Sequence, residues 1–395
     1  MRPALILALS LAPSLALAQS DFTRSPRNTD LAPAFDYQFR APLDPSGITL
    51  QTEVLVSGLT NPWGIEILPE GGYLVTERSG NLRYIKADGS VHGPIQGLPP
   101  VLAMGQGGLL DIALAPDFAQ SRRIYWTYAK PMEDATTATA AATGVLADDF
   151  AQVIQVRDIF VQEPAVPVPM HFGSRIVFDG EGHLFITTGD HALPVYQILA
   201  QDLGTTFGKV VRLNLDGTIP EDNPFVGDRD AIDSIWSLGH RNIQGAYYWE
   251  GQLWTIEHGP KGGDELNRPE PGGNHGWPVV SYGENYNGQP VGDGIASAPG
   301  FAEPVYFWDP VIAPSGIHPY DGAMFPEWQG DLLIASLSPG GVVRLEIADG
   351  RVVAEERLLH RFARIRDIEI AADGAILILT DEDNGQLIRL TRGDG

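Results

Sequence analysis

A strand–turn–strand pattern that recurs along most of this chain limits what it can fold into. From about residue 50, a short apolar run is followed by a turn rich in Gly, Pro or Asp, and then by a second and a third run. Apolar runs of this length, separated by such turns, predict short antiparallel strands. Six units show the pattern, at residues 64–85, 109–128, 174–213, 244–257, 322–345 and 366–390.

These units predict an all-β fold, a six-bladed β-propeller of four-stranded antiparallel blades. A lone four-stranded sheet cannot bury both of its faces, so sheets stacked around an axis form the stable arrangement. Stretches with helical periodicity are missing between the runs, which argues against a parallel sheet covered by helices. Seven blades are the alternative, because a count of repeats in a sequence can differ by one from the number of blades.

Two insertions interrupt the pattern. Residues 133–149 are rich in Ala, Thr and Asp and are expected to form an exposed loop. Residues 259–312 are rich in Gly, Pro, Asn, Trp and Tyr. Loops of this kind gather on one face of a propeller and build its site there, so the second insertion is expected to contribute functional residues.

The start of the chain predicts a signal peptide over residues 1–18. Arg2 precedes an apolar run that ends in Ala16-Leu17-Ala18, which is typical of a cleavage site. A membrane anchor is the alternative, but the run is short and contains Pro13. Residues 19–45 are expected to form an irregular arm, and residues 46–395 the propeller domain.

The composition bears on location and partners. The chain has no cysteine, so an exported form would depend on its core instead of disulfides, and a periplasmic or secreted location is expected. The formal net charge is −24 and basic clusters are missing. Nucleic acid and anionic membrane surfaces would be repelled, so we expect no nucleic-acid partner and no membrane insertion.

His171 and Asp190 form the first candidate pair of site residues. His171 precedes the first strand of the third unit, and Asp190 ends the next strand. Antiparallel neighbours bring these two positions together, so the carboxylate can orient the imidazole and stabilise its protonated form. A histidine so placed can act as a general base. The alternative is a surface-loop histidine beside a turn aspartate.

Further polar residues occur in loops between strands. Arg241 lies in Gly239-His240-Arg241-Asn242, where a guanidinium can grip a carboxylate or stabilise an oxyanion. Gln106 lies between glycines that permit close backbone approach. Each residue taken alone is also compatible with ordinary turn chemistry.

Two other segments suggest ligands. The Gly-rich segment 257–265 is expected to expose backbone carbonyls of the kind that calcium accepts, although an acidic turn is the simpler alternative. Arg364 and Arg366 are two positions apart at a strand start, so both face one side and suit a ligand with several carboxylates. Salt bridges on the rim are the alternative for this pair.

Taken together, these motifs resemble the soluble PQQ-dependent sugar dehydrogenases, and in particular the aldose sugar dehydrogenase branch. The resemblance covers about residues 50–392, and its motifs follow the family's order along the chain. The specific segments are 105–110, 208–217, 239–245, 257–260, 273–278 and 364–367. The resemblance implies a six-bladed catalytic propeller that oxidises aldose sugars at the anomeric carbon to lactones. It also implies bound pyrroloquinoline quinone (PQQ), bound calcium and an external electron acceptor.

The resemblance also implies roles for single residues. His171 is expected to remove the proton of the anomeric hydroxyl while hydride passes to PQQ, with Asp190 as the partner of His171. Arg241 and Gln106 are expected to flank the substrate and the quinone. The remaining cofactor contacts implied are Asn242, Tyr286, Ser336, Ser338, Arg364 and Arg366.

For the metal, the resemblance implies the carbonyls of Gly259 and Pro260 as ligands of a catalytic calcium. A second calcium is expected near Glu265 and the carbonyl of His275. One departure concerns Ser338, where better-studied members carry a lysine that contacts the cofactor. Arg364, Arg366 or Lys261 would have to compensate for the missing charge.

Two other functions are compatible with a propeller. A non-catalytic propeller that binds glycans or proteins would not need His171, Asp190, Arg241 and the arginine pair to converge around one axial pocket. A metal-dependent lactonase would need carboxylate and Asn ligands on the axis, whereas segment 259–260 offers backbone carbonyls.

Overall fold

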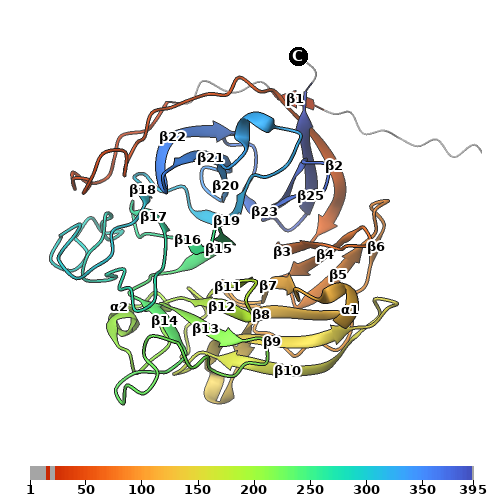
Figure 1. Cartoon of the computed structure of the whole chain (residues 1–395), viewed down its shortest axis with the longest axis horizontal. Helices are drawn as coiled ribbons and strands as arrows, with labels where there is room; N and C mark the ends of the chain where they lie inside the picture. Colours follow the sequence, from red (N-terminus) through yellow and green to blue (C-terminus); the bar gives the residue numbers. More distant parts are fainter. Residues whose placement is uncertain (1–14, 18–22, 394–395) are drawn as a thin grey trace, which may run out of the picture.

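The computed structural model describes residues 15–17 and 23–393, and it is an all-β ring of six sheets (Figure 1). Five sheets have four strands each, and the sixth has a fifth strand at its outer edge. Every strand pairing within the sheets is antiparallel. The expected six-bladed propeller is therefore confirmed, and the alternative of seven blades is wrong.

The blades follow one another along the chain. The first blade contains β3 (Pro62–Ile67), β4 (Tyr73–Glu77), β5 (Asn81–Ile85) and β6 (Val91–His92). The second contains β7 (Leu109–Leu114), β8 (Arg123–Pro131), β9 (Thr137–Leu146) and β10 (Val153–Val161). The third contains β11 (Gly173–Phe178), β12 (His183–Thr188), β13 (Lys209–Asn214) and β14 (Ile235–Leu238).

The remaining blades repeat this order. The fourth contains β15 (Ile243–Trp249), β16 (Gln252–Glu257), β17 (Asp264–Asn267) and β18 (Tyr306–Trp308). The fifth contains β19 (Pro314–Pro319), β20 (Leu332–Ser336), β21 (Gly341–Ala348) and β22 (Arg351–Leu358). Helices in the described residues are short: α1 (Phe118–Ser121), α2 (Pro194–Gln197), and the 3-10 turns η1 (Glu133–Ala135), η2 (Ile198–Gln201) and η3 (Pro326–Trp328).

The sixth blade joins the two ends of the propeller. It contains β23 (Ile365–Ile370), β24 (Ile376–Thr380) and β25 (Gly385–Arg392), together with β2 (Leu50–Leu59) from the start of the chain. Strand β2 pairs with β25 from Leu50 opposite Arg392 to Leu59 opposite Gly385. The ring is thus closed by backbone hydrogen bonds between segments more than 300 residues apart.

The hydrophobic core lies between neighbouring blades. One cluster joins Trp254 and Ile256 of the fourth blade to Leu332 and Ile334 of the fifth. Each blade buries one face against the blade before it and the other against the blade after it, as expected for stacked sheets. The innermost strands β3, β7, β11, β15, β19 and β23 contact one another in that order around the axis.

The expectation of an exposed loop over residues 133–149 is wrong. Most of this segment is β9, whose residues are almost all buried between β8 and β10. Ala142 lies opposite Trp126, and Ala140 lies opposite Tyr128. Small side chains on β9 leave room for these large rings of β8. This packing explains why the segment is rich in alanine although it is a buried strand.

The start of the chain runs along the outside of the ring (Figure 1). The predicted signal peptide lies outside the described residues except for β1 (Leu15–Leu17), which pairs with β2. The described part of the arm is held to the fourth blade by the Asp309 carboxylate, which accepts hydrogen bonds from the backbone N–H groups of Asn28 and Thr29 at 2.9 Å. No helix in the described part of the chain is long and apolar enough to cross a membrane.

Candidate active site

A cavity of ≈ 170 Å³ lies on the axis, at the end of the ring where the innermost strands begin. The early residues Trp63, Leu110, Gly173, Gln244 and Arg366 of five of these strands line it. The rest of the lining comes from connecting segments, and it includes Arg78, Gln106, Phe172, Asn242, His258, Leu337, Arg364 and Asp381. Four residues predicted from the sequence therefore share one cavity: Gln106, Asn242, Arg364 and Arg366.

His171 and Asp190 form the expected pair beside this cavity, whose lining includes the adjoining residues Phe172 and Gly173. Nδ1 of His171 lies 2.7 Å from Oδ1 of Asp190. The backbone N–H of His171 donates to Oε1 of Gln106 at 2.8 Å, which links the pair to the cavity lining. The two backbone segments approach closely, because a Cβ on Gly189 would overlap the carbonyl oxygen of His171. Only glycine fits before Asp190.

The environment keeps His171 neutral and Asp190 ionised. Burial lowers the pKa of His171 and the charge of Arg241 lowers it further, against the opposing effect of Asp190. Burial alone would raise the pKa of Asp190, but the hydrogen bond and charge of His171, together with Arg241, hold that pKa below its usual value. Because the carboxylate faces Nδ1, the neutral ring carries its proton there and leaves Nε2 as the basic atom.

Asp190 is fully buried, and both of its carboxylate oxygens are occupied. Trp277 donates its indole N–H to Oδ2 at 2.7 Å, and the backbone N–H of Ala192 donates to Oδ1 at 2.7 Å. Hydrogen bonds to a charged carboxylate favour the charged form. The arrangement therefore holds one orientation of the imidazole and stabilises the imidazolium that would form when the ring accepts a proton.

Arg241 lies beside this pair, and one of its buried nitrogen atoms has no partner among the described residues. Its backbone N–H donates to Oε2 of Glu257 at 2.6 Å, and Nη1 donates to the carbonyl oxygen of His258 at 3.0 Å. The guanidinium lies 5.3 Å from the ring centre of Trp277. Nε is buried and has no hydrogen-bond partner among the described residues. A buried donor without a partner is costly, which favours an anionic or carbonyl ligand at this position.

Arg364 and Arg366 face the same side, as their spacing predicts. Each donates through Nη2 to Oδ2 of Asp381 at 2.9 Å. Their environments differ, because the Arg364 side chain is 50% exposed and that of Arg366 only 8%. The Nε atom of Arg366 is also buried without a partner among the described residues. Two guanidinium groups on one wall suit a ligand with carboxylates.

Asn242 and Gln244 connect Arg366 to Gly173, which lies two residues after His171. Oδ1 of Asn242 accepts hydrogen bonds from the backbone N–H of Gly173 and from Nε2 of Gln244, both at 3.1 Å. Oε1 of Gln244 accepts from Nη1 of Arg366 at 3.2 Å. The cavity wall is therefore one connected hydrogen-bond network.

The four residues predicted to hold metal lie together in a second, smaller cavity of ≈ 10 Å³: Gly259, Pro260, Glu265 and His275. Among the described residues, the carbonyl oxygens of Gly259 and Pro260 accept no hydrogen bond. Burial raises the pKa of Glu265 well above its usual value, and the nearby Glu257 adds to this effect. Both ring nitrogens of His275 are buried without partners in the described part of the chain.

These features fit a bound cation. Calcium takes backbone carbonyls together with carboxylates, and a positive charge would relieve the repulsion between Glu265 and Glu257. Within the described residues, no group of three or more His, Cys, Asp or Glu side chains is arranged to hold a metal. Any metal in this cavity would therefore depend on carbonyl ligands.

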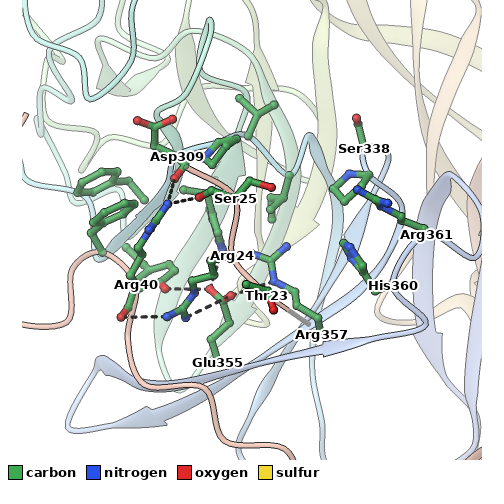
Figure 2. Close-up of a pocket in the computed structure, with 18 residues that line it drawn as sticks. Thr23, Arg24, Ser25, Arg40, Asp309, Ser338, Glu355, Arg357, His360 and Arg361 are labelled. Atoms are coloured by element: carbon green, nitrogen blue, oxygen red, sulfur yellow. Dashed lines mark hydrogen bonds and ion pairs between the residues drawn. The ribbon is translucent and has the colours of Figure 1, made fainter. Parts of the chain in front are cut away.

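Three predicted cofactor residues lie apart from the axial cavity. Tyr286 is 75% exposed in the long loop of the fourth blade. Ser336 is buried, and its hydroxyl donates to the carbonyl oxygen of Ile312 at 2.6 Å. Ser338 lines a separate cavity of ≈ 280 Å³ between the arm, the fourth blade and the fifth blade (Figure 2). Lys261 pairs with Glu284 at 2.6 Å. The contacts of Tyr286, Ser336 and Ser338 with a cofactor stay predictions.

The structure adds residues that sequence reasoning did not assign. Trp277 lies in segment 273–278, which contributes to the family resemblance. The sequence of that segment does not indicate that the indole reaches Asp190, 87 residues away. Asp381 directly follows β24 of the sixth blade, much as Asp190 follows β12 of the third, and that parallel is the one signal that could have identified it. Trp63 lies on the first innermost strand and carries no such signal.

Comparisons with known proteins identify the family of this chain. A family model described as glucose/sorbosone dehydrogenase matches residues 59–389. The aldose sugar dehydrogenase of Escherichia coli (strain K12) is 42% identical over 348 residues, which cover 87% of this chain and 93% of that protein. The quinoprotein glucose dehydrogenase B of Acinetobacter calcoaceticus is 27% identical over 413 residues, covering 83% of this chain and 85% of that protein.

Solved structures give the same result. The apo-form of the soluble aldose sugar dehydrogenase from Escherichia coli superposes with a TM-score of 0.83 and 40% identity, covering 87% of this chain and all of that one. The PQQ-bound form of an aldose sugar dehydrogenase from Streptomyces coelicolor superposes with a TM-score of 0.68 and 26% identity, covering 89% and 99%. This chain belongs to the glucose/sorbosone dehydrogenase family of oxidoreductases.

Proposed function

We propose that this chain oxidises aldose sugars at the anomeric carbon to lactones, with PQQ as its bound redox cofactor and an external acceptor for the electrons. The observation that carries this proposal is the buried His171–Asp190 pair beside a cavity lined by arginines. A neutral imidazole backed by a carboxylate is suited to take a proton from a sugar hydroxyl.

The residues of the cavity fit PQQ, an anionic quinone with several carboxylates. Arg78, Arg364 and Arg366 line the cavity, and the buried Nε atoms of Arg241 and Arg366 lack partners within the described residues. Arg364 and Arg366 would hold carboxylates of the cofactor, while Gln106 and Asn242 would contact it from the segments before β7 and β15. PQQ when bound would supply a two-electron acceptor for the hydride of the sugar.

The proton is handled by residues of the chain. Nε2 of His171 takes the proton of the anomeric hydroxyl, and Nδ1–H remains hydrogen-bonded to Asp190. The Asp190 carboxylate, fixed by Trp277, stabilises the imidazolium without becoming protonated itself. Arg241 lies close enough to lower the pKa of His171, so it would also favour return of the proton once the sugar has reacted.

Calcium is proposed at the carbonyl oxygens of Gly259 and Pro260, and a second ion near Glu265 and His275. The support is the small cavity that these residues share, the carbonyls without donors, and the raised pKa of Glu265. A calcium ion there would act as a Lewis acid toward a carbonyl oxygen of the cofactor.

We also propose that the chain is exported to the periplasm or secreted after cleavage at Ala18. The support is the sequence of residues 1–18 and a chain without cysteine. Mass spectrometry of the mature protein from a periplasmic extract tests this, and Gln19 as the first residue is the expected result.

The decisive test of function is dye reduction by the purified apo-protein with glucose and other aldoses, with and without PQQ and calcium. Turnover that requires both additions supports the proposal, and a chelator should then abolish it until calcium is restored. Hydrolysis of a lactone without PQQ would support a metal-dependent lactonase instead. Glycan binding without turnover under any of these conditions would support a binding propeller.

A further inference from the structure

The Arg175 side chain lies near the axis of the ring. Arg175 is two residues further along β11 than Gly173, which lines the axial cavity. It lies on β11, four residues after His171, and its side chain is 7% exposed. Another cavity, of ≈ 240 Å³, lies at the opposite end of the axis from the axial cavity. Arg175, Asp111 and Asp367 line it. The Arg175 guanidinium lies 4.3 Å from the ring centre of Trp63, which lines the first cavity. Arg175 therefore separates the two cavities.

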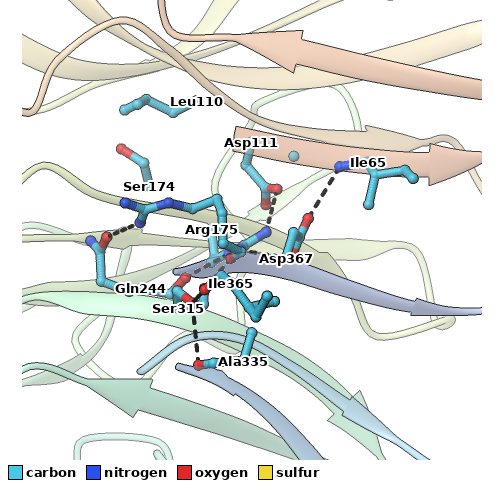
Figure 3. Close-up of polar contacts among 12 residues, drawn as sticks. Ile65, Leu110, Asp111, Ser174, Arg175, Gln244, Ser315, Ala335, Ile365 and Asp367 are labelled. Atoms are coloured by element: carbon cyan, nitrogen blue, oxygen red, sulfur yellow. Dashed lines mark hydrogen bonds and ion pairs between the residues drawn. The ribbon is translucent and has the colours of Figure 1, made fainter. Parts of the chain in front are cut away.

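The contacts of this one side chain reach all six blades (Figure 3). From β11, Arg175 pairs with Asp111 of β7 at 2.8 Å and with Asp367 of β23 at 2.9 Å. Nε donates to the carbonyl oxygen of Gln244 on β15 at 2.6 Å, and Nη2 donates to that of Ser315 on β19 at 2.7 Å. Asp367 in turn accepts the backbone N–H of Ile65 on β3 at 3.1 Å.

The same contacts lead to the residues that face the cofactor cavity. Gln244, whose carbonyl binds Arg175, contacts Arg366 and Asn242 through its side chain. Trp63 lies close to both arginines, because the Arg366 guanidinium is 5.7 Å from the centre of the same ring. The positions of Arg366 and Asn242 thus depend on where Arg175 holds Gln244 and Trp63.

We propose that Arg175 is a positioning residue for the cofactor: it closes the axis beneath the cavity and fixes Arg366 and Asn242 where PQQ binds. This inference rests on the proposed function, since it concerns the binding of PQQ. Loss of Arg175 would leave Asp111 and Asp367 buried without a cation beneath an anionic cofactor, and would release Gln244 and Trp63. Supporting groups of this kind commonly change ligand affinity when they are removed.

A purely structural role is the competing explanation, and the chain offers a matched control. Arg344 on β21 is equally buried, pairs with Asp331 at 2.5 Å and Glu356 at 2.7 Å, and lies 5.8 Å from the ring centre of Trp328. It lines neither axial cavity. Arg175 and Arg344 thus share burial, two carboxylates and an indole, and differ in their place relative to the axis.

The experiment compares Arg175→Met and Arg344→Met with the wild-type protein. The melting temperature of each apo-protein is measured first, followed by the dissociation constant for PQQ, by titration in the presence of calcium. Both variants should lose thermal stability, whereas only Arg175→Met should bind PQQ about ten-fold more weakly or worse. Arg175→Lys keeps the charge without the forked contacts and should give an intermediate affinity.

Equal PQQ affinity in Arg175→Met and Arg344→Met would overturn the inference and leave the proposed function standing. If Arg175→Met does not fold, Asp111→Asn replaces it, with Asp331→Asn as its control. The same difference is expected there, reduced to a few-fold, and equal PQQ affinities would again overturn the inference. A wild-type protein that binds no PQQ would overturn both this inference and the proposed function.

Discussion

The indole nitrogen of Trp277 lies 2.7 Å from Oδ2 of Asp190, and this hydrogen bond joins the long loop of the fourth blade to the third blade. Oδ1 of the same carboxylate faces His171. Asp190 is therefore held from two blades, and the orientation of the imidazole depends on both. The orientation of the His171 imidazole therefore depends on how the third and fourth blades pack, as well as on the loop that carries His171.

Replacing His171 by Gln should abolish sugar oxidation while PQQ binding changes little. Glutamine can still donate to Asp190, but it has no atom that accepts a proton at neutral pH. A loss of about 10²-fold or more in kcat is expected for removal of a general base. Steady-state dye reduction and PQQ titration measure the two effects, and turnover that stays at the wild-type level would exclude His171 as the base.

The rate should fall at acidic pH with a midpoint below the ordinary histidine pKa. The reaction needs neutral His171, so kcat/KM rises with pH through the pKa of this residue, which burial and Arg241 lower from 6.5. Asp190 raises that pKa, so Asp190→Asn should move the acid limb to still lower pH. The variant should also reduce turnover, because the imidazolium loses its stabilising charge. A limb that moved toward higher pH would contradict this assignment.

Replacing Arg366 by Ala should weaken PQQ binding more than it alters turnover at saturating cofactor. Arg366 is buried against Gln244 and Asp381, so its removal leaves Asp381 with fewer partners beside an anionic ligand. Arg364→Ala serves as the comparison, and its effect should be smaller because its side chain is half-exposed and screened by water. A pure turnover defect in Arg366→Ala would argue against a role in holding carboxylates.

Replacing Ala142 by Leu should destabilise the second blade without changing the site. Ala142 is fully buried opposite Trp126, so a larger side chain has no space there. Overpacking of this kind costs about 1–3 kcal/mol. Chemical denaturation should show the loss, and Ala119→Leu on the exposed surface of α1 should leave the unfolding midpoint near that of the wild type.

The fold could be predicted from the sequence because each blade repeats a local pattern of runs and turns. Strand β9 escaped this reasoning, since its alanines are explained only by Trp126 and Tyr128 on the neighbouring strand. A strand made largely of small side chains has few of the large apolar residues on which strand prediction depends.

The site was predictable to the extent that its residues lie in short motifs. His171 lies two residues before β11 and Asp190 two residues after the antiparallel neighbour β12, so their contact follows from local topology. The contacts of Asp190 with Trp277, and of Arg175 with Ser315 and Asp367, join different blades. Such contacts depend on the angle at which blades pack around the axis, which a local pattern does not contain.

The pairing of β2 with β25 determines when the ring can close during synthesis of the chain. Strand β25 is synthesised after every other strand of the propeller, so β2 must wait without this partner while the five blades between them are made. Five blades can assemble from consecutive strands during that time, but the sixth cannot form until β23, β24 and β25 have been added to β2. A chain that stops short of residue 385 would keep an open ring and an unpaired strand edge, which is a template for association with other chains.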